Sequence, residues 1–407
     1  MSDADSIDRD KPHQSLPPNV KLLGVTSLLN DIASEMIYPL LPNLLRSMLV
    51  GSALHLGIVV GVIEGAADAT ASLLKLFAGH WSDRVGRRKT WIVSGYWFAT
   101  LTRPLLGLVT GPWQVLACRV GDRFGKGIRT SARDALIAES TGPESRGWAF
   151  GFHRGMDHLG AAIGPLVAML FLWLWPDQLR TMFLLTIVPG LAVMALLIFG
   201  LKESGPRVVT PPSEHFVLSL APFHKNFRVY LLSLAVFTLG NSSDLFLLAQ
   251  AGTLGASNAM LALLWFAFHV VKSAGNMLAG RAVPKLGTRP MIFAGWIVYA
   301  AVYIGFAMAN QLWHVWALFM AYAVFYALTE PSEKTLVAQL TAGVGKGLAY
   351  GWYNFAIGIM TLPASLLFGL LYDRYGAVAA FGTGAGLAML AALVLVFVKA
   401  SPASDED

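Results

Sequence analysis

The sequence predicts an all-α membrane protein with twelve transmembrane helices in two pseudo-symmetric six-helix bundles. Composition is the first of three observations behind this prediction. Of the 407 residues, 55% are hydrophobic and 13% are charged, with a mean hydropathy of +0.58, whereas soluble domains carry about 25% charged residues. The second observation is a regular succession of long apolar segments, and the third is an internal repeat. At about 20 residues per span, the length suits about twelve spans.

The apolar segments give the expected helices in order. In the first half they are Leu22–Leu45, Leu54–Phe77, Thr90–Val109, Trp113–Ile137, Ala149–Trp173 and Thr181–Leu201. In the second half they are Arg228–Gln250, Asn258–Ala279, Pro290–Ala309, Leu312–Leu336, Leu348–Tyr372 and Ala377–Val398. Backbone N–H and C=O groups find no partner in lipid, so apolar segments of this length are expected to be helical.

Polar segments separate the expected domains. These are a disordered cytoplasmic tail (1–20), an N-terminal bundle (21–202), a cytoplasmic linker (203–225), a C-terminal bundle (226–399) and a second cytoplasmic tail (400–407). The linker carries Pro206, Pro211 and Pro212 and is the longest polar interruption. The first tail has no apolar core before a cleavage site, so we do not expect a secretory signal there.

Lys and Arg fall on alternate loops, which predicts the orientation. They are Arg84, Arg87, Arg88 and Lys89, then Arg146, then Lys202, Arg207 and Lys225, then Arg281, Lys285 and Arg289, then Lys346. Because short cytoplasmic loops collect these residues, both termini are expected to be cytoplasmic, in a bacterial inner membrane. The net charge of +6 therefore indicates topology rather than nucleic-acid binding, and the single Cys118 excludes an intrachain disulfide.

A shift of about 200 residues aligns the two halves, which predicts a parallel repeat. Loop landmarks and helix interiors agree on nearly one offset. Gly79, Gly86 and Arg88 fall on Gly280, Gly287 and Arg289; Trp113 and Val115 fall on Trp313 and Val315; Leu136 falls on Leu336; and Arg146, Gly147 and Gly151 fall on Lys346, Gly347 and Gly351.

The basic segment Gly79–Lys89 lies between two apolar segments and carries a specific pattern. Its ordered residues are Gly79, Asp83, Arg84, Gly86, Arg87 and Arg88, with Trp81 where a small aliphatic residue is usual. This pattern resembles the signature loop between helices 2 and 3 of the major facilitator superfamily. The resemblance implies a central cavity lined by helices 1, 4, 7 and 10. It also implies transport by rocking of two halves about a midplane site.

A second, partial resemblance lies in the fifth expected helix. Gly160, Gly164 and Pro165 are similar to the Gly-x-x-x-Gly-Pro core of the antiporter motif in drug–proton antiporters of the superfamily, although Leu166, Val167 and Ala168 replace its further glycines. Small residues four apart let helices pack closely. The partial match favours export.

Ionisable residues within the expected spans are the candidate site residues, because a charge at bilayer depth costs at least about 2.5–3.5 kcal/mol on insertion scales. In the first half the predicted proton-coupling and substrate residues are Asp31, Glu35, Glu64, Asp68, Arg119, Asp122, Arg123, Lys126, His153, Arg154, Asp157 and His158. Charged faces cannot meet lipid, so these side chains are expected around one watered cavity. The alternative is a set of mutual salt bridges that only holds the bundle together. Asp31, Glu35, Asp68 and Asp157 are the candidate proton carriers.

The second half is poorer in charge and richer in aromatic residues. Asp244, Tyr322 and Tyr326 complete the predicted cavity. An aromatic wall that faces a charged wall suits an amphipathic organic solute. The predicted gating and conformational residues are Gly79, Asp83, Arg84, Gly86, Arg87, Arg88, Arg133, Asp134, Gly160, Gly164 and Pro165.

The predicted function is proton-coupled secondary active transport of a small amphipathic organic solute, with export favoured. The alternatives are import of an organic anion or siderophore, which the many cations also suit, and a non-transporting membrane sensor or binding protein. No Walker-type loop, nucleophile elbow or zinc-spaced Cys/His cluster appears in the sequence, so we expect no enzyme, cofactor or metal. The expected partners are the solute, protons and the lipid bilayer, with a monomer and no nucleic acid.

Overall fold

The computed structural model describes residues 16–85, 87–141, 146–203, 219–341 and 346–398, apart from the side chains of 76–85, 146–148, 280, 281, 284 and 346–348. The described residues form helices and no strands, as the sequence predicts. Eight segments are long and apolar enough to cross a membrane: Leu56–Lys75, Ala149–Leu174, Leu179–Gly200, Lys225–Thr253, Asn258–Ala279, Thr288–Met308, Leu312–Leu340 and Ala349–Val396.

The helices fall into two groups in chain order. The N-terminal group is α1 (Pro18–Glu35), η1 (Tyr38–Leu40), α2 (Leu41–Met48), α3 (Leu56–Val85), α4 (Arg88–Leu105), α5 (Pro112–Glu139), α6 (Arg146–Leu174), α7 (Leu179–Leu185), α8 (Ile187–Ala195) and η3 (Leu196–Gly200), a π-helical turn. The C-terminal group is α9 (Lys225–Gly240), α10 (Leu245–Thr253), α11 (Asn258–Leu286), α12 (Thr288–Met308), α13 (Leu312–Leu340) and α14 (Lys346–Val396).

Two expected helices are interrupted, which corrects the boundaries drawn from the sequence. The first one breaks between α1 and α2, where η1 contains Pro39 and α2 starts just before Pro42, because proline removes a backbone donor and limits the preceding residue. The seventh breaks at Asn241–Asp244, directly after α9 ends at Gly240. The second break places the short polar side chains of Asn241, Ser242, Ser243 and Asp244 inside the molecule.

The expected loop at Gly79–Lys89 is shorter than its charge suggests. The backbone of α3 continues to Val85 and α4 begins at Arg88. The segment Leu56–Val85 contains no proline, and its polar end alone does not terminate the helix. The last helix also differs, since α14 joins two expected helices across a kink at Gly376, whose φ of 82° lies in the left-handed region that glycine tolerates.

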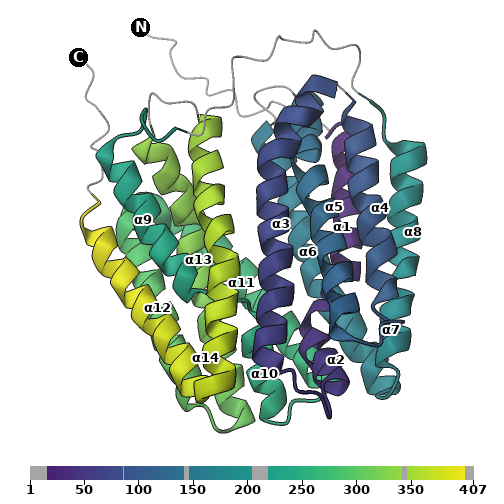
Figure 1. The fold of residues 1–407 in the computed structure, drawn as a ribbon. Helices are drawn as coiled ribbons and strands as arrows, with labels where there is room; N and C mark the ends of the chain where they lie inside the picture. Colours follow the sequence, from purple (N-terminus) through teal and green to yellow (C-terminus); the bar gives the residue numbers. More distant parts are fainter. Residues whose placement is uncertain (1–15, 86, 142–145, 204–218, 342–345, 399–407) are drawn as a thin grey trace, which may run out of the picture.

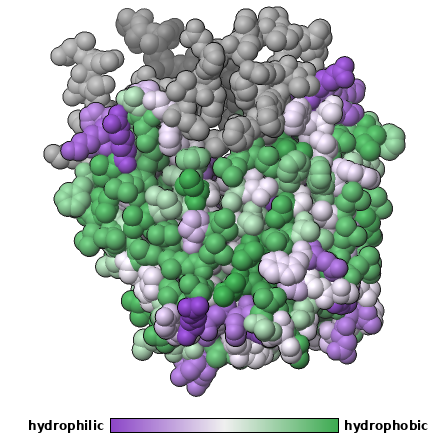
Figure 2. All heavy atoms as spheres, viewed as in Figure 1, coloured by the Kyte–Doolittle hydropathy of each residue, from purple (hydrophilic) through white to green (hydrophobic). Residues whose placement is uncertain are grey.

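The two groups stand side by side, and α3 packs along α14 while α6 packs against α11 (Figure 1). Glycines permit the closest approach between α3 and α14. A Cβ atom on Gly61 would lie 2.4 Å from the Ser365 carbonyl oxygen, and one on Gly369 would lie 2.3 Å from the Gly57 carbonyl oxygen. The visible face carries a broad apolar band between more polar ends (Figure 2). This pattern is typical of a protein surrounded by lipid.

The repeat appears in the helix contacts. A Cβ on Gly95 would meet the Cβ of Arg129, and a Cβ on Gly295 would meet the side chain of Thr329, each at 2.5 Å. The members of each pair lie 200 positions apart in the sequence. The α4–α5 and α12–α13 contacts are therefore repeats of one packing arrangement.

Candidate functional site

A cavity of about 310 Å³ lies between the two groups of helices. The N-terminal group contributes Tyr38 and Asp68, and most other lining residues come from α9, α13, α14 and the break between α9 and α10. The break matters because Asn241, Ser242, Ser243 and Asp244 interrupt regular helix there and line the cavity wall. Of the residues predicted from the sequence, Asp68, Asp244 and Tyr326 line this cavity.

Asp244 is held by hydroxyl groups. Tyr322 donates a hydrogen bond to Oδ1 of Asp244 at 2.7 Å, and Tyr326 lies 3.3 Å from both carboxylate oxygens. The ammonium group of Lys272 lies 3.7 Å from the centre of the Tyr326 ring and forms an ion pair with Glu330 at 2.8 Å. The structure therefore satisfies the Asp244 carboxylate with neutral donors, while the nearby cation is engaged by another acid.

Three further carboxylates line the same cavity, namely Asp68, Glu330 and Glu333. Glu333 is 8% exposed and accepts a hydrogen bond from the Tyr353 hydroxyl at 2.7 Å. The Asp68 side chain is 40% exposed and lies 3.2 Å from Nε of Arg123. Among the described residues, only Arg123 and Lys272 form ion pairs with these four acids, so Asp244 and Glu333 have no cationic partner.

The most buried charges of the N-terminal group form ion pairs away from the cavity. Arg119 donates two hydrogen bonds to Glu64, at 2.8 Å and 2.7 Å. Arg103 pairs with Asp122 at 2.9 Å and also donates to the backbone and side-chain oxygens of Asn30. A void of only about 10 Å³ touches Arg103, Arg119 and Asp122. That is about the space of one water molecule, which is too small for an organic solute.

Other predicted residues also lie apart from each other. Glu35 accepts a hydrogen bond from the Trp265 indole at 2.7 Å and lies 3.8 Å from His269. Asp157 lies 3.6 Å from His153 and 3.8 Å from Arg154, on the same helix. Together with the Arg103 contact of Asp122, these contacts place Glu35, Asp122 and Asp157 against different partners. That a single pocket surrounds all three remains a prediction.

The remaining predicted cavity residues, Asp31, Lys126 and His158, do not line the 310 Å³ cavity in the described part of the chain. Asp31 accepts a hydrogen bond from the neighbouring Asn30 amide at 2.9 Å. Lys126 is exposed on α5, and His158 is part-buried on α6.

The predicted gating residues are described only in part. Gly86 and the side chains of Asp83 and Arg84 lie outside the described residues, Gly79 lies within α3, and Arg87 is exposed at the start of α4. Arg88 pairs with Glu139 at 3.2 Å, while Arg133 pairs with its neighbour Asp134 at 3.0 Å. Gly160 and Gly164 let α6 approach α1, since their Cβ atoms would lie 2.5 Å and 2.6 Å from the Leu28 and Ile32 carbonyl oxygens. Pro165 directly follows this contact, inside α6.

Polar contacts join the two groups at the end of the molecule where α2 and α10 lie, opposite the start of α1 and the end of α14 (Figure 1). Asn43 donates to Asn258 at 2.8 Å, and Arg46 donates to the Ala249 carbonyl oxygen at 3.0 Å. Asp373 accepts hydrogen bonds from the backbone N–H groups at the start of α3, at 2.8 Å and 2.6 Å. These contacts close that end of the interface between the groups.

Sequence reasoning left Tyr38, Glu330, Glu333 and Tyr353 out of the predicted cavity. The two glutamates carried a usable signal, because they are acids three positions apart within an expected span, on either side of Pro331. Tyr38 and Tyr353 carried none, since an aromatic residue in an apolar segment is equally consistent with packing. Only the helix break at Pro39 and the fold of α14 bring them to the cavity.

Comparisons with known proteins agree with this architecture. The family model of the Major Facilitator Superfamily matches residues 23–266 and 229–407. An uncharacterised MFS-type transporter of Methanocaldococcus jannaschii is 31% identical over 391 residues, which cover 95% of this chain and 96% of the relative. A multidrug resistance protein of Salmonella arizonae is 24% identical over 323 residues, 78% of each chain.

Among solved structures, a D-xylose-proton symporter superposes with a TM-score of 0.74 at 18% identity, covering 94% of this chain and 98% of the symporter. This likeness shows the shared fold. The long family match and the relative at 31% identity show the family itself. The chain is a multi-pass membrane transporter, rather than an enzyme, and belongs to the Major Facilitator Superfamily.

Proposed function

We propose that this protein is a proton-coupled secondary active transporter that exports a small amphipathic organic solute by alternating access. In this proposal the chain crosses a bacterial inner membrane twelve times, in two six-helix bundles with both termini cytoplasmic, and works as a monomer. The α9–α10 and α7–η3 segments each form one span, and α14 forms two. The charged α1, α4 and α5 complete the set beyond the eight strongly apolar segments.

The observation that carries the proposal is the cavity shared by the two helix groups. Tyr38 and Asp68 come from one group, while Asp244 and Tyr326 come from the other. A solute bound there contacts both groups, so a rocking motion that separates them changes its access to the two sides of the membrane. The polar contacts at the α2–α10 end, such as Asn43 with Asn258, leave the end near the termini as the open side. With cytoplasmic termini, this is an inward-facing state.

Proton coupling is assigned to carboxylates that line the cavity. Asp68 is the candidate among the four carriers predicted from the sequence, because it alone of those four lines the cavity. Its 40% exposed side chain can reach water, and Nε of its partner Arg123 lies 3.2 Å away. Protonation of Asp68 releases Arg123, so the proton changes a contact between α3 and α5 as well as the charge of the cavity.

The chemistry of the lining favours an uncharged or cationic amphipathic solute over an organic anion. The four carboxylates around the cavity repel an anion, while Tyr38, Phe237, Phe325 and Tyr326 offer aromatic faces. Such faces attract cations and apolar rings. The partial antiporter motif at Gly160–Pro165 and the multidrug resistance protein among the relatives support export over import.

The test is solute flux in proteoliposomes with an imposed pH gradient. Transport driven by the gradient, with proton movement when solute is added, is expected for the native chain. In Asp68→Asn, proton movement is expected to vanish while solute binding remains. Solute binding without any flux in the native chain would instead support the membrane sensor, and flux that ignores the gradient would exclude proton coupling.

A further inference from the structure

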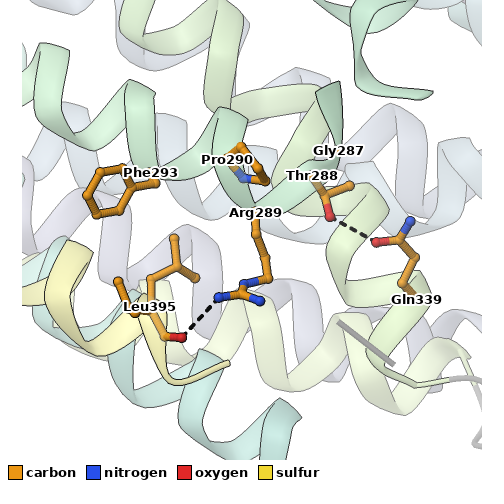
Figure 3. A pocket seen from close by; sticks show the side chains of 8 residues that line it. Gly287, Thr288, Arg289, Pro290, Phe293, Gln339 and Leu395 are labelled. Atoms are coloured by element: carbon orange, nitrogen blue, oxygen red, sulfur yellow. Dashed lines mark hydrogen bonds between the residues drawn. The ribbon is translucent and has the colours of Figure 1, made fainter. Parts of the chain in front are cut away.

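A second cavity lies far from the proposed transport site, where the start of α12 meets the end of α14 (Figure 3). We call it the Arg289 groove. Its volume is about 550 Å³, and it is lined by Gly287, Thr288, Arg289, Pro290, Phe293, Gln339, Leu395 and Val396. Phe293 is 37% exposed and Val396 is 54% exposed, so one wall of the groove is an open apolar surface. In a membrane protein such a surface faces acyl chains.

The groove holds an uncompensated positive charge. Nη2 of Arg289 donates a hydrogen bond to the Val396 carbonyl oxygen at 2.9 Å, while its Nε is buried without a hydrogen-bond partner. Thr288 donates to the Gln339 side chain at 2.9 Å, so both neighbours of Arg289 in the groove are neutral (Figure 3). No acidic side chain lines the groove among the described residues.

The repeat provides a counterpart that already contains its own anion. The N-terminal group has a groove of about 610 Å³ whose lining includes Lys89, Val93, Ile198 and Glu203. Nζ of Lys89 donates to the Ile198 and Leu201 carbonyl oxygens at 2.8 Å and 2.7 Å, as Arg289 does to Val396. Glu203 accepts hydrogen bonds from the backbone N–H groups of Arg88 and Lys89, at 2.8 Å and 3.1 Å. A carboxylate therefore fills this position in the first repeat.

The structure also corrects the register of the repeat at this point. The sequence pairs Arg88 with Arg289, through the glycines before them. In the structure Arg88 pairs with Glu139 at 3.2 Å, and the equivalent contact is Thr288 with Gln339. Lys89 is thus the counterpart of Arg289, because the loop before α4 is one residue longer. The first groove balances Arg88 and Lys89 with Glu139 and Glu203, whereas the second keeps only the charge of Arg289.

We propose that the Arg289 groove binds an anionic phospholipid of the surrounding leaflet. The phosphate takes the position that Glu203 occupies in the first repeat, beside the guanidinium group and the first N–H groups of α12, where Gly287 supplies no side-chain cap. Arginine and helix N-termini both favour phosphate. An acyl chain then lies along Phe293 and Val396. Because anionic lipids concentrate in the cytoplasmic leaflet, the end of the molecule near the termini is the appropriate side.

The test compares lipids by native mass spectrometry of the detergent-purified full chain. Phosphatidylglycerol is expected to bind about tenfold more tightly than phosphatidylcholine of the same chains, because only the former carries a net charge for Arg289. Arg289→Gln should remove this preference, and Arg289→Lys should keep about half of its free energy, since lysine retains the charge without the planar fork. Binding of phosphatidylcholine should be the same in all three proteins.

The first repeat supplies the matched controls. Lys89→Gln should leave the preference unchanged, because Glu203 fills that groove. Glu203→Gln should create a second phosphatidylglycerol site. An undiminished preference in Arg289→Gln would overturn the proposal, as would inorganic phosphate that protects the protein from heat as well as the lipid does. Asp405, Glu406 and Asp407 are the acids nearest to Val396 in the sequence. Lipid binding that appears only after their replacement by Asn and Gln would likewise overturn it.

Discussion

The two groups of helices share one packing arrangement and satisfy their buried polar groups in different ways. Arg103 and Asp122 form an ion pair in the N-terminal group. At positions 200 residues later stand Tyr303 and Tyr322, which hydrogen-bond to Ser242 and Asp244 instead. The first group neutralises charge with charge, and the second surrounds a carboxylate with hydroxyls. Equivalent positions thus carry an ion pair in one half and tyrosine hydroxyl groups in the other.

In the proposed function, this difference determines which ionisable residues are available to a solute. In a bidentate pair such as Arg119 with Glu64, the guanidinium group and the carboxylate donate and accept two hydrogen bonds with each other. Few donors and acceptors of this pair therefore remain for a ligand. A carboxylate that receives hydrogen bonds only from neutral groups, such as Asp244, has no cationic partner among the described residues. The number of charges in a bundle is therefore a poor guide to where a transporter binds its solute.

The largest expected effect concerns the buried pair of the N-terminal group. Glu64→Gln leaves the Arg119 guanidinium group buried without its counter-ion, and breaking such a pair costs about 3–5 kcal/mol. We expect a large fall in the thermal unfolding midpoint of the purified protein, measured in detergent. The double variant Glu64→Gln/Arg119→Met should recover most of the stability, because no charge is left unpaired. If the Glu64→Gln protein were stable but no longer bound solute, Glu64 would belong to the solute site. The solute site would then lie in the N-terminal group, which would contradict the contrast between the two groups.

Asp244→Asn tests the other side of the comparison. It removes the charge that Tyr322 and Tyr326 surround but keeps a hydrogen-bond acceptor, so the fold should persist. We expect solute transport to fall about a hundredfold, as for a lost charge contact worth about 2–3 kcal/mol. Flux in proteoliposomes measures this, with the unfolding midpoint as the control for folding. Normal flux would mean that the hydroxyl cage of Asp244 only holds the helices together.

The contact between the groups can be tested through glycine. Gly369→Leu forces a side chain against the Gly57 carbonyl oxygen, and overpacking of this kind costs about 1–3 kcal/mol. We expect lower stability and reduced flux, because α3 and α14 can no longer approach. Gly382→Leu is the matched control in the second part of α14, beyond the kink at Gly376, where an added Cβ meets no atom within 4 Å. Equal effects of the two substitutions would show that this close approach is unimportant.

The smallest expected effect tests what the hydroxyl groups around Asp244 contribute. Tyr322→Phe removes the 2.7 Å hydrogen bond to Asp244 and retains the ring. A single hydrogen bond to a charged group contributes about 1.5–3 kcal/mol, and Tyr326 remains to compensate part of it. We therefore expect solute affinity to change about threefold to tenfold, which equilibrium binding to the purified protein measures. An effect as large as that of Asp244→Asn would indicate that the hydroxyl, rather than the carboxylate, contacts the solute.

Much of the fold was predictable because lipid imposes strict rules. Long apolar segments must be helices, and the order and approximate bounds of α3 to α6 and α11 to α13 follow from hydropathy. The family was predictable from the residues at Gly79–Arg88, since their order and spacing are specific. The internal repeat was predictable because one offset of about 200 residues aligns most of the two halves. The alignment changes by one residue at the loop before α4.

The site depended on the tertiary structure. Local sequence shows that Asp122 and Asp244 are both intramembrane acids, but it does not show that Arg103 reaches the first and two tyrosines reach the second. The helix breaks at Pro39 and Asn241 then place Tyr38 and Asp244 on one cavity, although about 200 residues separate them in the chain. Hydropathy depends on each residue and its neighbours, whereas the availability of a charge depends on which distant partner the packing brings within hydrogen-bond distance. The sequence by itself determined the helices, the repeat and the family, and only the packing decided which charges remain for a solute.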